Sequence, residues 1–276
     1  MYVAVDNGGT KTIIAVLDAH GVIQERIKFP TSRDYDQFVK DLKEAKSKLK
    51  IQEYSAGVGG VTGPKTDRAN GIGIAFSNLP WKNVPFVKDF EETFKCPMAI
   101  ENDAKLAGLS EAMLIKDEYS KVLYMTVSTG IGFSLITNGV IDENVGDAGG
   151  DAIMLEHEGK MTSWEDFASG KAIVERYGKK ASDITDEQTW KAIAKDLAKG
   201  IIHLIAIMQP EVIVFGGGVG EHFEQFGKFL EEYINDYALP LIDVPKLIKA
   251  QRPEFAVIYG CYDLAKQKFP HAYTHN

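Results

Sequence analysis

The chain has 276 residues, a formal net charge of −8 and an ordinary globular composition, with 45% hydrophobic and 25% charged residues. This length exceeds that of a typical single domain and predicts a protein of two lobes. The acidic balance, with no basic stripe, argues against a nucleic-acid partner. No signal peptide is visible and no apolar run is long enough to cross a bilayer, so we expect a cytoplasmic protein without a membrane partner.

The first half of the chain is predicted to alternate between strands and helices. Three strands come first, and the turn between the first two contains Gly8 and Gly9. Apolar residues at helical spacing and capping residues then mark the helices. We expect strands at 2–5, 12–17, 22–29, 54–58 and 97–100, and helices at 35–49, 84–94 and 102–115.

The second half of the chain repeats this order, starting about 120 residues further on. A strand, a small-residue turn, a second strand and an Asn-Gly hairpin appear again, which favours two lobes of related topology that share a cleft. The alternative is that all β-meanders resemble one another. We expect strands at 121–127, 133–137, 140–141 and 212–215, and helices at 163–177, 186–208, 221–237 and 260–269.

Three glycine-rich turns follow apolar strands, at 6–10, 128–132 and 216–218. Glycine lets backbone N–H groups approach a phosphate closely, because it has no side chain and tolerates positive φ. None of the three is a Walker A loop or a Gly-x-Gly-x-x-Gly turn, so each alone is a weak signal. Their combination favours a nucleotide held between the lobes. Asp6 is placed to hold a divalent cation, and Thr10 and Lys11 can donate to phosphate oxygens.

Glu101, Asn102 and Asp103 stand between a predicted strand and a predicted helix. The simple interpretation is a helix cap, with Asn102 as N-cap and Asp103 in the first turn. The functional interpretation is a carboxylate at a strand end that takes the proton from an attacking hydroxyl. Both can hold together, because a rigid cap orients the base.

Several short motifs occur in order along nearly the whole chain. They are Asp6-Asn7-Gly8-Gly9-Thr10-Lys11, Asn78-Leu79-Pro80-Trp81, Glu101-Asn102-Asp103-Ala104, Ser128-Thr129-Gly130-Ile131-Gly132, Gly146-Asp147-Ala148-Gly149, Glu165-x-x-x-Ser169-Gly170 and Pro210-Glu211-x-Ile213-x-x-Gly216-Gly217-Gly218. The combination resembles the ROK family of repressors, uncharacterised frames and sugar kinases.

This resemblance implies an α/β protein with the two-lobed actin/hexokinase-like (ribonuclease H-like) ATPase fold and a central cleft. The N-terminal lobe would be 1–117, joined by a C-terminal helix at 260–276, and the C-terminal lobe would be 118–259. It also implies an ATP-dependent kinase of a hexose, glucose being the simplest substrate, that phosphorylates the 6-hydroxyl. Alternatives are a kinase of an N-acetylhexosamine, fructose or another hexose, or a catalytically weak regulator that binds sugar or nucleotide.

The resemblance assigns roles to individual residues. Asp103 would be the catalytic base, and Asp6 would hold Mg²⁺ through water. The sugar would be bound by Asn78, Asn102, Asp103, Asp147 and Glu165. ATP would be bound by Gly8, Gly9, Thr10, Lys11, Thr129, Gly130, Gly217 and Gly218. Some relatives use polyphosphate as the donor, and a homodimer is common in the family.

The chain departs from the family pattern in its second lobe. Asp147 stands where the family has a sugar-binding Glu, and Gly150 stands where it has a His that binds both sugar and zinc. The cysteine-rich zinc loop is missing as well, so we expect no structural zinc. His157 is a candidate to replace the missing His, although a lone loop histidine is more often solvated. The DNA-binding branch of the family carries a helix-turn-helix ahead of the first motif, which begins here at Asp6, so we expect no nucleic-acid partner.

Elemental analysis tests the zinc prediction. Protein purified without added metal is expected to contain less than about 0.1 zinc per chain, because a closed zinc site needs four thiolate or imidazole ligands. One zinc per chain would contradict it.

Overall fold

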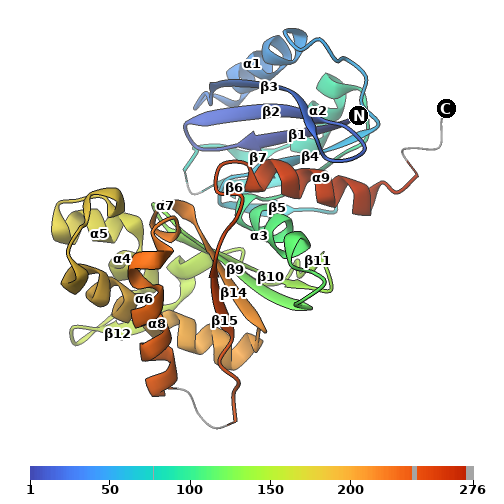
Figure 1. The fold of residues 1–276 in the computed structure, drawn as a ribbon. Helices are drawn as coiled ribbons and strands as arrows, with labels where there is room; N and C mark the ends of the chain where they lie inside the picture. The colour runs from blue at the N-terminus through green and yellow to red at the C-terminus, as the bar shows by residue number, and fades with distance from the viewer. Residues whose placement is uncertain (77, 238–240, 272–276) are drawn as a thin grey trace. The chain divides into compact units, whose positions relative to one another are not determined.

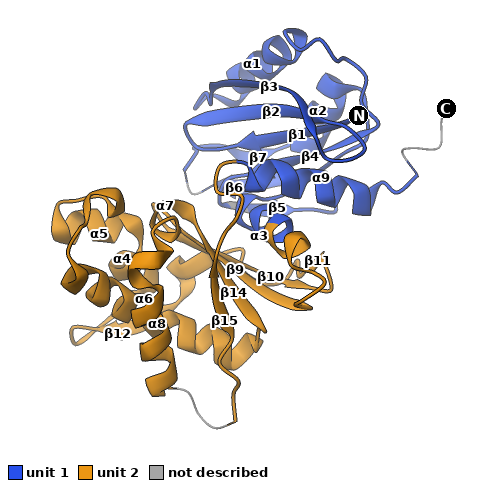
Figure 2. Ribbon diagram, in the orientation of Figure 1, with its two compact units in different colours: residues 1–110, 255–276 blue, residues 111–254 orange. Residues whose placement is uncertain are grey.

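The computed structural model describes residues 1–76, 78–237 and 241–271 and divides into two compact units (Figure 2). Unit 1 comprises Met1–Ser110 and the segment from Phe255 onward, and unit 2 comprises Glu111–Glu254. The division falls within helix α3 (Asp103–Leu114). Residues 272–276 of the C-terminal helix expected from the sequence lie outside the described residues.

Unit 1 is built on a five-stranded sheet (Figure 1). Its strand order is β3-β2-β1-β4-β8. β2 pairs antiparallel with both β1 and β3, whereas β1, β4 and β8 are parallel. The strands are β1 (Tyr2–Asn7), β2 (Lys11–Leu17), β3 (Ile23–Pro30), β4 (Ala56–Val61) and β8 (Met98–Asn102).

Helices α1 (Tyr35–Ser47) and α2 (Phe86–Phe94) pack against each other, and α9 (Ala256–Lys268) packs against β1 and β4. The N-terminus of α1 is fixed by Asp34, whose carboxylate accepts the Gln37 amide at 2.8 Å. An aromatic cluster fills the core between the helices. Its buried members are Phe38, Trp81, Phe86, Phe90 and Phe94.

A small antiparallel sheet in unit 1 was not expected from the sequence. It consists of β5 (Pro64–Asp67), β6 (Ile72–Phe76) and β7 (Lys82–Val84). Its strands are only three to five residues long, so their alternation is too weak to recognise. The helix expected to start at Val84 starts at Phe86 instead, because Pro85 disfavours a helical conformation for the residue before it.

Unit 2 contains a second five-stranded sheet, ordered β11-β10-β9-β14-β15. In both sheets the third, second and first strands are antiparallel neighbours, and the first, fourth and fifth are parallel. The predicted repetition of topology is therefore confirmed. The strands are β9 (Lys121–Val127), β10 (Ile131–Thr137), β11 (Val140–Ile141), β14 (Val212–Gly216) and β15 (Lys246–Lys249).

The helices of unit 2 correct one prediction, because the single helix expected at 163–177 is two helices. Ser169 interrupts it with an extended backbone, and its side chain accepts the Ala172 amide at 3.2 Å as an N-cap. The helices of unit 2 are α4 (Trp164–Ala168), α5 (Gly170–Tyr177), α6 (Glu187–Met208), α7 (Gly217–Gly220) and α8 (Phe223–Tyr237). None of the described helices has both the length and the apolar character needed to cross a bilayer.

A hairpin in unit 2 precedes α4 and was also not expected. It is formed by β12 (Met154–His157) and β13 (Lys160–Ser163), which pair as antiparallel strands. Glu158 and Gly159, the two residues of its turn, both have positive φ. A turn of this kind matches the twist of the two strands. The hairpin leads the chain from the loop at 146–151 directly into α4.

The contact between α3 and α9 depends on Gly260. A Cβ atom at this position would overlap the carbonyl of Leu106. We expect Gly260→Ala to lower the free energy of unfolding by about 2 kcal/mol or more, because the two helix backbones must separate. Urea unfolding measures this, with Gly218→Ala as the control, since a Cβ at Gly218 meets nothing within 4 Å. Equal stability of the two variants would contradict the tight contact.

Candidate active site

The parallel strands β1, β4 and β8 of unit 1 end at one edge of the sheet. Asp6 on β1 is level with Gly60 on β4 and with Glu101 on β8. The residues that follow these positions therefore leave the sheet side by side. Because the carboxyl ends of parallel strands are where open α/β sheets bind ligands, this edge is the candidate site.

Asp103 lies at the start of α3, immediately after β8 ends. The side-chain oxygen of the buried Asn102 accepts the amides of Ala104 at 2.8 Å and Lys105 at 3.2 Å, which confirms the predicted N-cap. The Asp103 carboxylate also accepts the Ala104 amide, at 2.8 Å. The cap therefore fixes the backbone that carries Asp103.

The electrostatics at this edge are set by two carboxyl groups with little hydration. Burial raises the pKa of Asp103, although hydrogen bonds from the Ala104 amide, the Thr62 side chain and the Gly63 amide oppose the rise. Burial and the nearby Asp103 raise the pKa of Asp6 from 3.8 to about 7, and the positive charge of Lys11 opposes this. The two groups thus share a site that favours a proton or a cation.

The first glycine-rich turn joins β1 to β2 in the same unit. The Gly8 amide donates to the Lys11 carbonyl at 3.0 Å, which closes the turn, and Thr10 and Lys11 are exposed. A Cβ atom at Gly9 would lie 3.0 Å from the Cβ of Asn78. The structure therefore brings the predicted residues of this turn against Asn78, which comes from a distant part of the chain.

A buried chain of hydroxyl groups supports this turn and was missed by the sequence analysis. The Asn7 side-chain Nδ2 donates to the Thr12 hydroxyl at 3.0 Å, and the Thr12 hydroxyl lies 2.8 Å from that of Thr31. The Thr31 hydroxyl in turn donates to the Gly8 carbonyl at 2.8 Å. No short motif marks Thr31. It follows β3, and it reaches the turn because β3 pairs with β2.

The second glycine-rich turn joins β9 to β10 in unit 2. The Ser128 amide donates to the Gly130 carbonyl at 2.8 Å, and the exposed Thr129 lies between them. Glu165 of α4 holds the far side of the turn, because its carboxylate accepts the Ile131 amide at 2.8 Å. A Cβ at Gly130 would lie 2.5 Å from that carboxylate. Glu165 therefore contacts the predicted phosphate turn directly.

The third turn, after β14, lies beside the second. Gly216 pairs with Thr126 near the end of the parallel strand β9. Gly217 has a φ of 79°, and a Cβ there would lie 2.6 Å from the carbonyl of Val127, so only glycine fits. Gly218 is exposed and faces open space. The turns predicted to contact phosphate and adenosine thus share one edge of unit 2.

The loop at 146–151, where the resemblance implies a sugar-binding histidine, is closely packed at Gly150. A Cβ at Gly150 would lie 2.9 Å from the Cβ of Ile131 and 3.3 Å from the ring of Trp164. A histidine at position 150 therefore does not fit unless this core shifts. Asp147, the other substituted position, is exposed.

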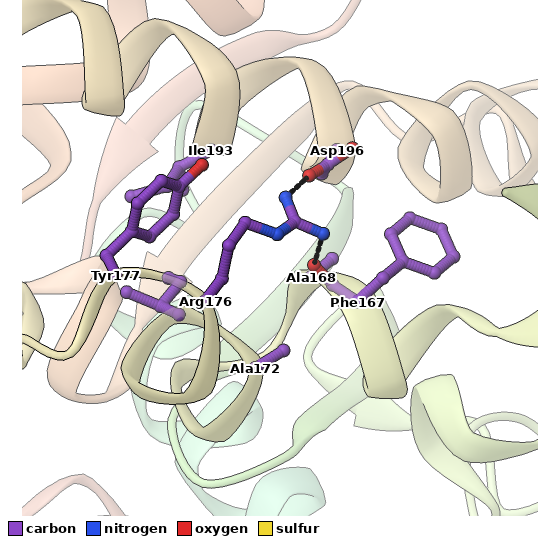
Figure 3. Close-up of a pocket in the computed structure, with 8 residues that line it drawn as sticks. Phe167, Ala168, Ala172, Arg176, Tyr177, Ile193 and Asp196 are labelled. Carbon is purple, nitrogen blue, oxygen red and sulfur yellow. Dashed lines mark hydrogen bonds and ion pairs between the residues drawn. The ribbon is translucent and has the colours of Figure 1, made fainter. Parts of the chain in front are cut away.

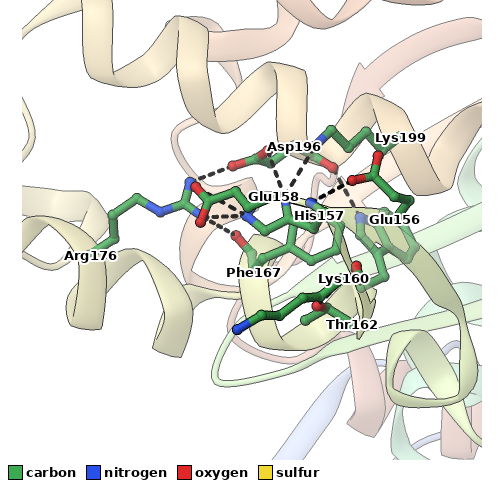
Figure 4. A network of polar contacts seen from close by, with 11 residues as sticks. Glu156, His157, Glu158, Lys160, Thr162, Phe167, Arg176, Asp196 and Lys199 are labelled. Carbon is green, nitrogen blue, oxygen red and sulfur yellow. Dashed lines mark hydrogen bonds and ion pairs between the residues drawn. The ribbon is translucent and has the colours of Figure 1, made fainter.

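His157 is not the solvated loop residue that the sequence favoured, because it lies on strand β12 within a polar network (Figure 4). Its side chain is 13% exposed, and its ring stacks on Phe167 with the ring centres 4.1 Å apart. One ring nitrogen lies 3.2 Å from the Arg176 guanidinium and the other 3.1 Å from the Lys199 amine. Both nitrogens are thus engaged within unit 2.

Arg176 is one of the residues that line the pocket drawn in Figure 3. Its guanidinium pairs with the carboxylate of Asp196 and donates to the Phe167 carbonyl at 3.4 Å. The Asp196 carbonyl accepts the indole N–H of Trp164 at 3.1 Å. These contacts hold α4, which carries Glu165, against α5 and α6. Among the described residues, no three His, Cys, Asp or Glu side chains gather closely enough to hold a metal ion.

The two matched sheets, each with a glycine-rich turn between its first two strands, define an α/β ATPase fold of the actin/hexokinase type. The crystal structure of a ROK family glucokinase from Streptomyces griseus, in complex with glucose and AMPPNP, matches with a TM-score of 0.77 and 21% identity, and covers 96% of this chain and 99% of that one. The predicted fold class is therefore confirmed.

The model of the ROK family matches residues 2–268, so the chain belongs to the ROK family, as predicted. The fructokinase of Zymomonas mobilis is 30% identical over 241 residues, which cover 79% of this chain and 80% of that protein. The N-acetylgalactosamine kinase of Shewanella sp. strain ANA-3 is 28% identical over 255 residues, 80% of this chain and 82% of that protein. These relatives are named as kinases of different sugars.

The raised pKa of Asp6 predicts a pH dependence of stability. Because this pKa is about 7 in the folded protein and near 3.8 in the unfolded chain, the folded protein binds more protons between these values. The free energy of unfolding therefore falls as the pH rises from 4 to 7, by at most about 4 kcal/mol from this group. Asp6→Asn is expected to remove the part of the fall that comes from Asp6, while the buried Asp103 keeps its own part.

Urea unfolding of the metal-free protein at pH 5.0 and pH 7.5 measures this effect. The exposed Asp243→Asn is the control and is expected to keep the wild-type pH dependence. An Asp6→Asn variant that loses as much stability as the wild type between the two pH values would contradict the assignment.

Proposed function

We propose that the chain is an ATP-dependent hexose kinase in which Asp103 acts as the general base. It would take the proton from the 6-hydroxyl of the sugar while that oxygen attacks the γ-phosphate. Phosphoryl transfer needs positioning and charge neutralisation more than covalent chemistry. The residues of both units fit these two tasks.

The placement of Asp103 carries the proposal. A general base works best when its pKa lies near the operating pH and its position is fixed. Burial raises the pKa of Asp103, and the Asn102 cap fixes its backbone. Asp103 is mostly buried but keeps some exposed surface, so a substrate hydroxyl has access to it. A carboxylate that served only to cap α3 would gain nothing from this loss of hydration.

The phosphate groups of ATP would be bound by the glycine-rich turns. Gly8, Gly9, Thr10 and Lys11 would surround the β- and γ-phosphates from unit 1, Thr129 and Gly130 would contact phosphate from unit 2, and Gly217 and Gly218 would lie against adenosine. Mg²⁺ fits beside Asp6, because a divalent cation offsets the repulsion between the Asp6 and Asp103 carboxylates that helps to raise the pKa of Asp6. When bound, it would neutralise charge on the phosphates.

The sugar would be bound by Asn78, Asn102 and Asp103 of unit 1 and by Asp147 and Glu165 of unit 2. We propose glucose as the substrate. Fructose and N-acetylhexosamines are the alternatives, and the relatives named above act on sugars of both kinds. Because a histidine at position 150 would overlap the core, one sugar hydroxyl would lack the partner that the family resemblance implies. His157 would not replace that partner, because its ring stacks on Phe167.

The contact between Glu165 and the Ile131 amide favours a second candidate, a catalytically weak protein that binds sugar or nucleotide and regulates another process. A carboxylate committed to the backbone has less capacity to bind sugar. We favour the kinase, because a binding protein does not need Asp6 and Asp103 together. We also propose that ATP rather than polyphosphate is the donor and that the protein acts in the cytoplasm.

Release of ADP, measured by a coupled assay with ATP and Mg²⁺, tests the proposal. The panel contains glucose, fructose, mannose, N-acetylglucosamine, N-acetylmannosamine and N-acetylgalactosamine. We expect turnover with at least one sugar, and Asp103→Asn is expected to lower kcat by about 10²- to 10⁴-fold while ATP still binds. The exposed Asp166→Asn on α4 is the control. Tight sugar binding without turnover would support the regulator instead.

A further inference from the structure

An ion pair links the small sheet of unit 1 to the end of β8. Arg68 lies between β5 and β6, and its Nε donates to Glu101 Oε2 at 2.8 Å while its Nη2 donates to Oε1 at 2.6 Å. The two bonds run side by side, as in a fork that grips both carboxylate oxygens. Such bidentate pairs fix direction as well as distance.

This pair is buried, which distinguishes it from the ion pairs on the surface. The side chain of Glu101 is 1% exposed and that of Arg68 is 14% exposed. By contrast, the pair between Lys48 and Glu44 on α1 has side chains that are 59% and 67% exposed. A buried carboxylate without its partner is strongly destabilised, so Glu101 and Arg68 constrain each other.

Glu101 connects the pair to the proposed catalytic base. Its Oε1, which accepts from Arg68, also accepts the Asn102 amide at 2.8 Å. Asn102 in turn caps α3 through the amides of Ala104 and Lys105. A continuous series of hydrogen bonds therefore runs from Arg68 to the turn of backbone that carries Asp103.

Arg68 itself is held by a local turn. The Asp67 carboxylate accepts the Asn70 amide at 3.1 Å and the Asn70 side chain at 2.8 Å. This closes the connection between β5 and β6 around Arg68. The turn between β5 and β6 therefore fixes the backbone that carries the Arg68 guanidinium. After β6 the chain continues to Asn78, a proposed sugar-binding residue.

We propose that Arg68 is a positioning residue that acts through Glu101 and sets the orientation of Asn102 and Asp103. This inference rests on the proposed function, because it assigns Arg68 to the same base and the same sugar. Arg68 does not touch the reacting atoms. Loss of the fork lets Glu101 rotate, and the backbone between Asn102 and Asp103 then loses one of its restraints.

Steady-state kinetics of the full chain test the proposal, with the sugar that the wild type turns over. Arg68→Met is expected to lower kcat about tenfold or more and to raise KM for the sugar, with KM for ATP within about twofold of wild type. Arg68→Lys keeps the charge without the fork and is expected to recover part of this loss. Lys48→Met, on the exposed pair, is the matched control. Unchanged kcat and sugar KM in a folded Arg68→Met would overturn the proposal.

A second variant covers the case in which Arg68→Met fails to fold. Arg68→Met combined with Glu101→Gln leaves no unpaired buried charge and is expected to fold, yet to show a similar loss of kcat. A purely structural role predicts instead that the double variant recovers wild-type kcat. That recovery would contradict the proposal.

Hydrogen exchange separates this inference from the proposed function. By NMR of the ligand-free protein, the Ala104 and Lys105 amides are expected to exchange about tenfold faster in the double variant than in the wild type, whereas the amides of α1 are unchanged. If the wild type turns over no sugar, the kinase proposal fails, and this measurement still decides the role of Arg68. Equal exchange at both amides would overturn it.

Discussion

The pairing of β1, β4 and β8 as parallel strands in one register is the constraint on which the rest of unit 1 depends. It places Asp6 level with Gly60 and Glu101, so that the chain leaves all three strands at one edge. If the pairing of β8 shifted by one residue, the side chains along β8 would move to the other face of the sheet, and Asn102 and Asp103 would no longer lie beside Asp6. Everything attributed to the site follows from this register: the mutual influence of Asp6 and Asp103, the donors from Thr62 and Gly63, and the cap of α3.

Unit 2 repeats the same constraint with different residues. The parallel pair β9 and β14 aligns the turn at 128–132 with the turn after Gly216. There the close packing of glycine is the dominant effect, because Gly130, Gly150 and Gly217 each lie against an atom that a side chain would displace. A histidine at position 150 would overlap Ile131 and Trp164 in this packing. The network of His157, Arg176, Asp196 and Lys199 instead holds the hairpin and α4 in place (Figure 4).

Much of this arrangement could be predicted from the sequence, because its signals are local. The strands, the glycine turns and the Asn102 cap depend on residues within a few positions of one another. What could not be predicted depends on contacts between distant segments. Arg68 and Glu101 are 33 positions apart, and Thr31 reaches Gly8 only because β2 and β3 pair. The break at Ser169 was missed because helix periodicity continues through it.

The central claim is that Asp103 and the turn from Asp6 to Lys11 perform phosphoryl transfer to a sugar hydroxyl. The most direct measurement is ³¹P NMR of the protein with ATP, Mg²⁺ and the hexose panel. The account predicts a new phosphomonoester signal coupled to the two protons at C6 of the sugar, formed together with ADP and absent for Asp103→Asn. ADP and inorganic phosphate without any phosphomonoester, or the same phosphomonoester formed equally fast by Asp103→Asn, would contradict it.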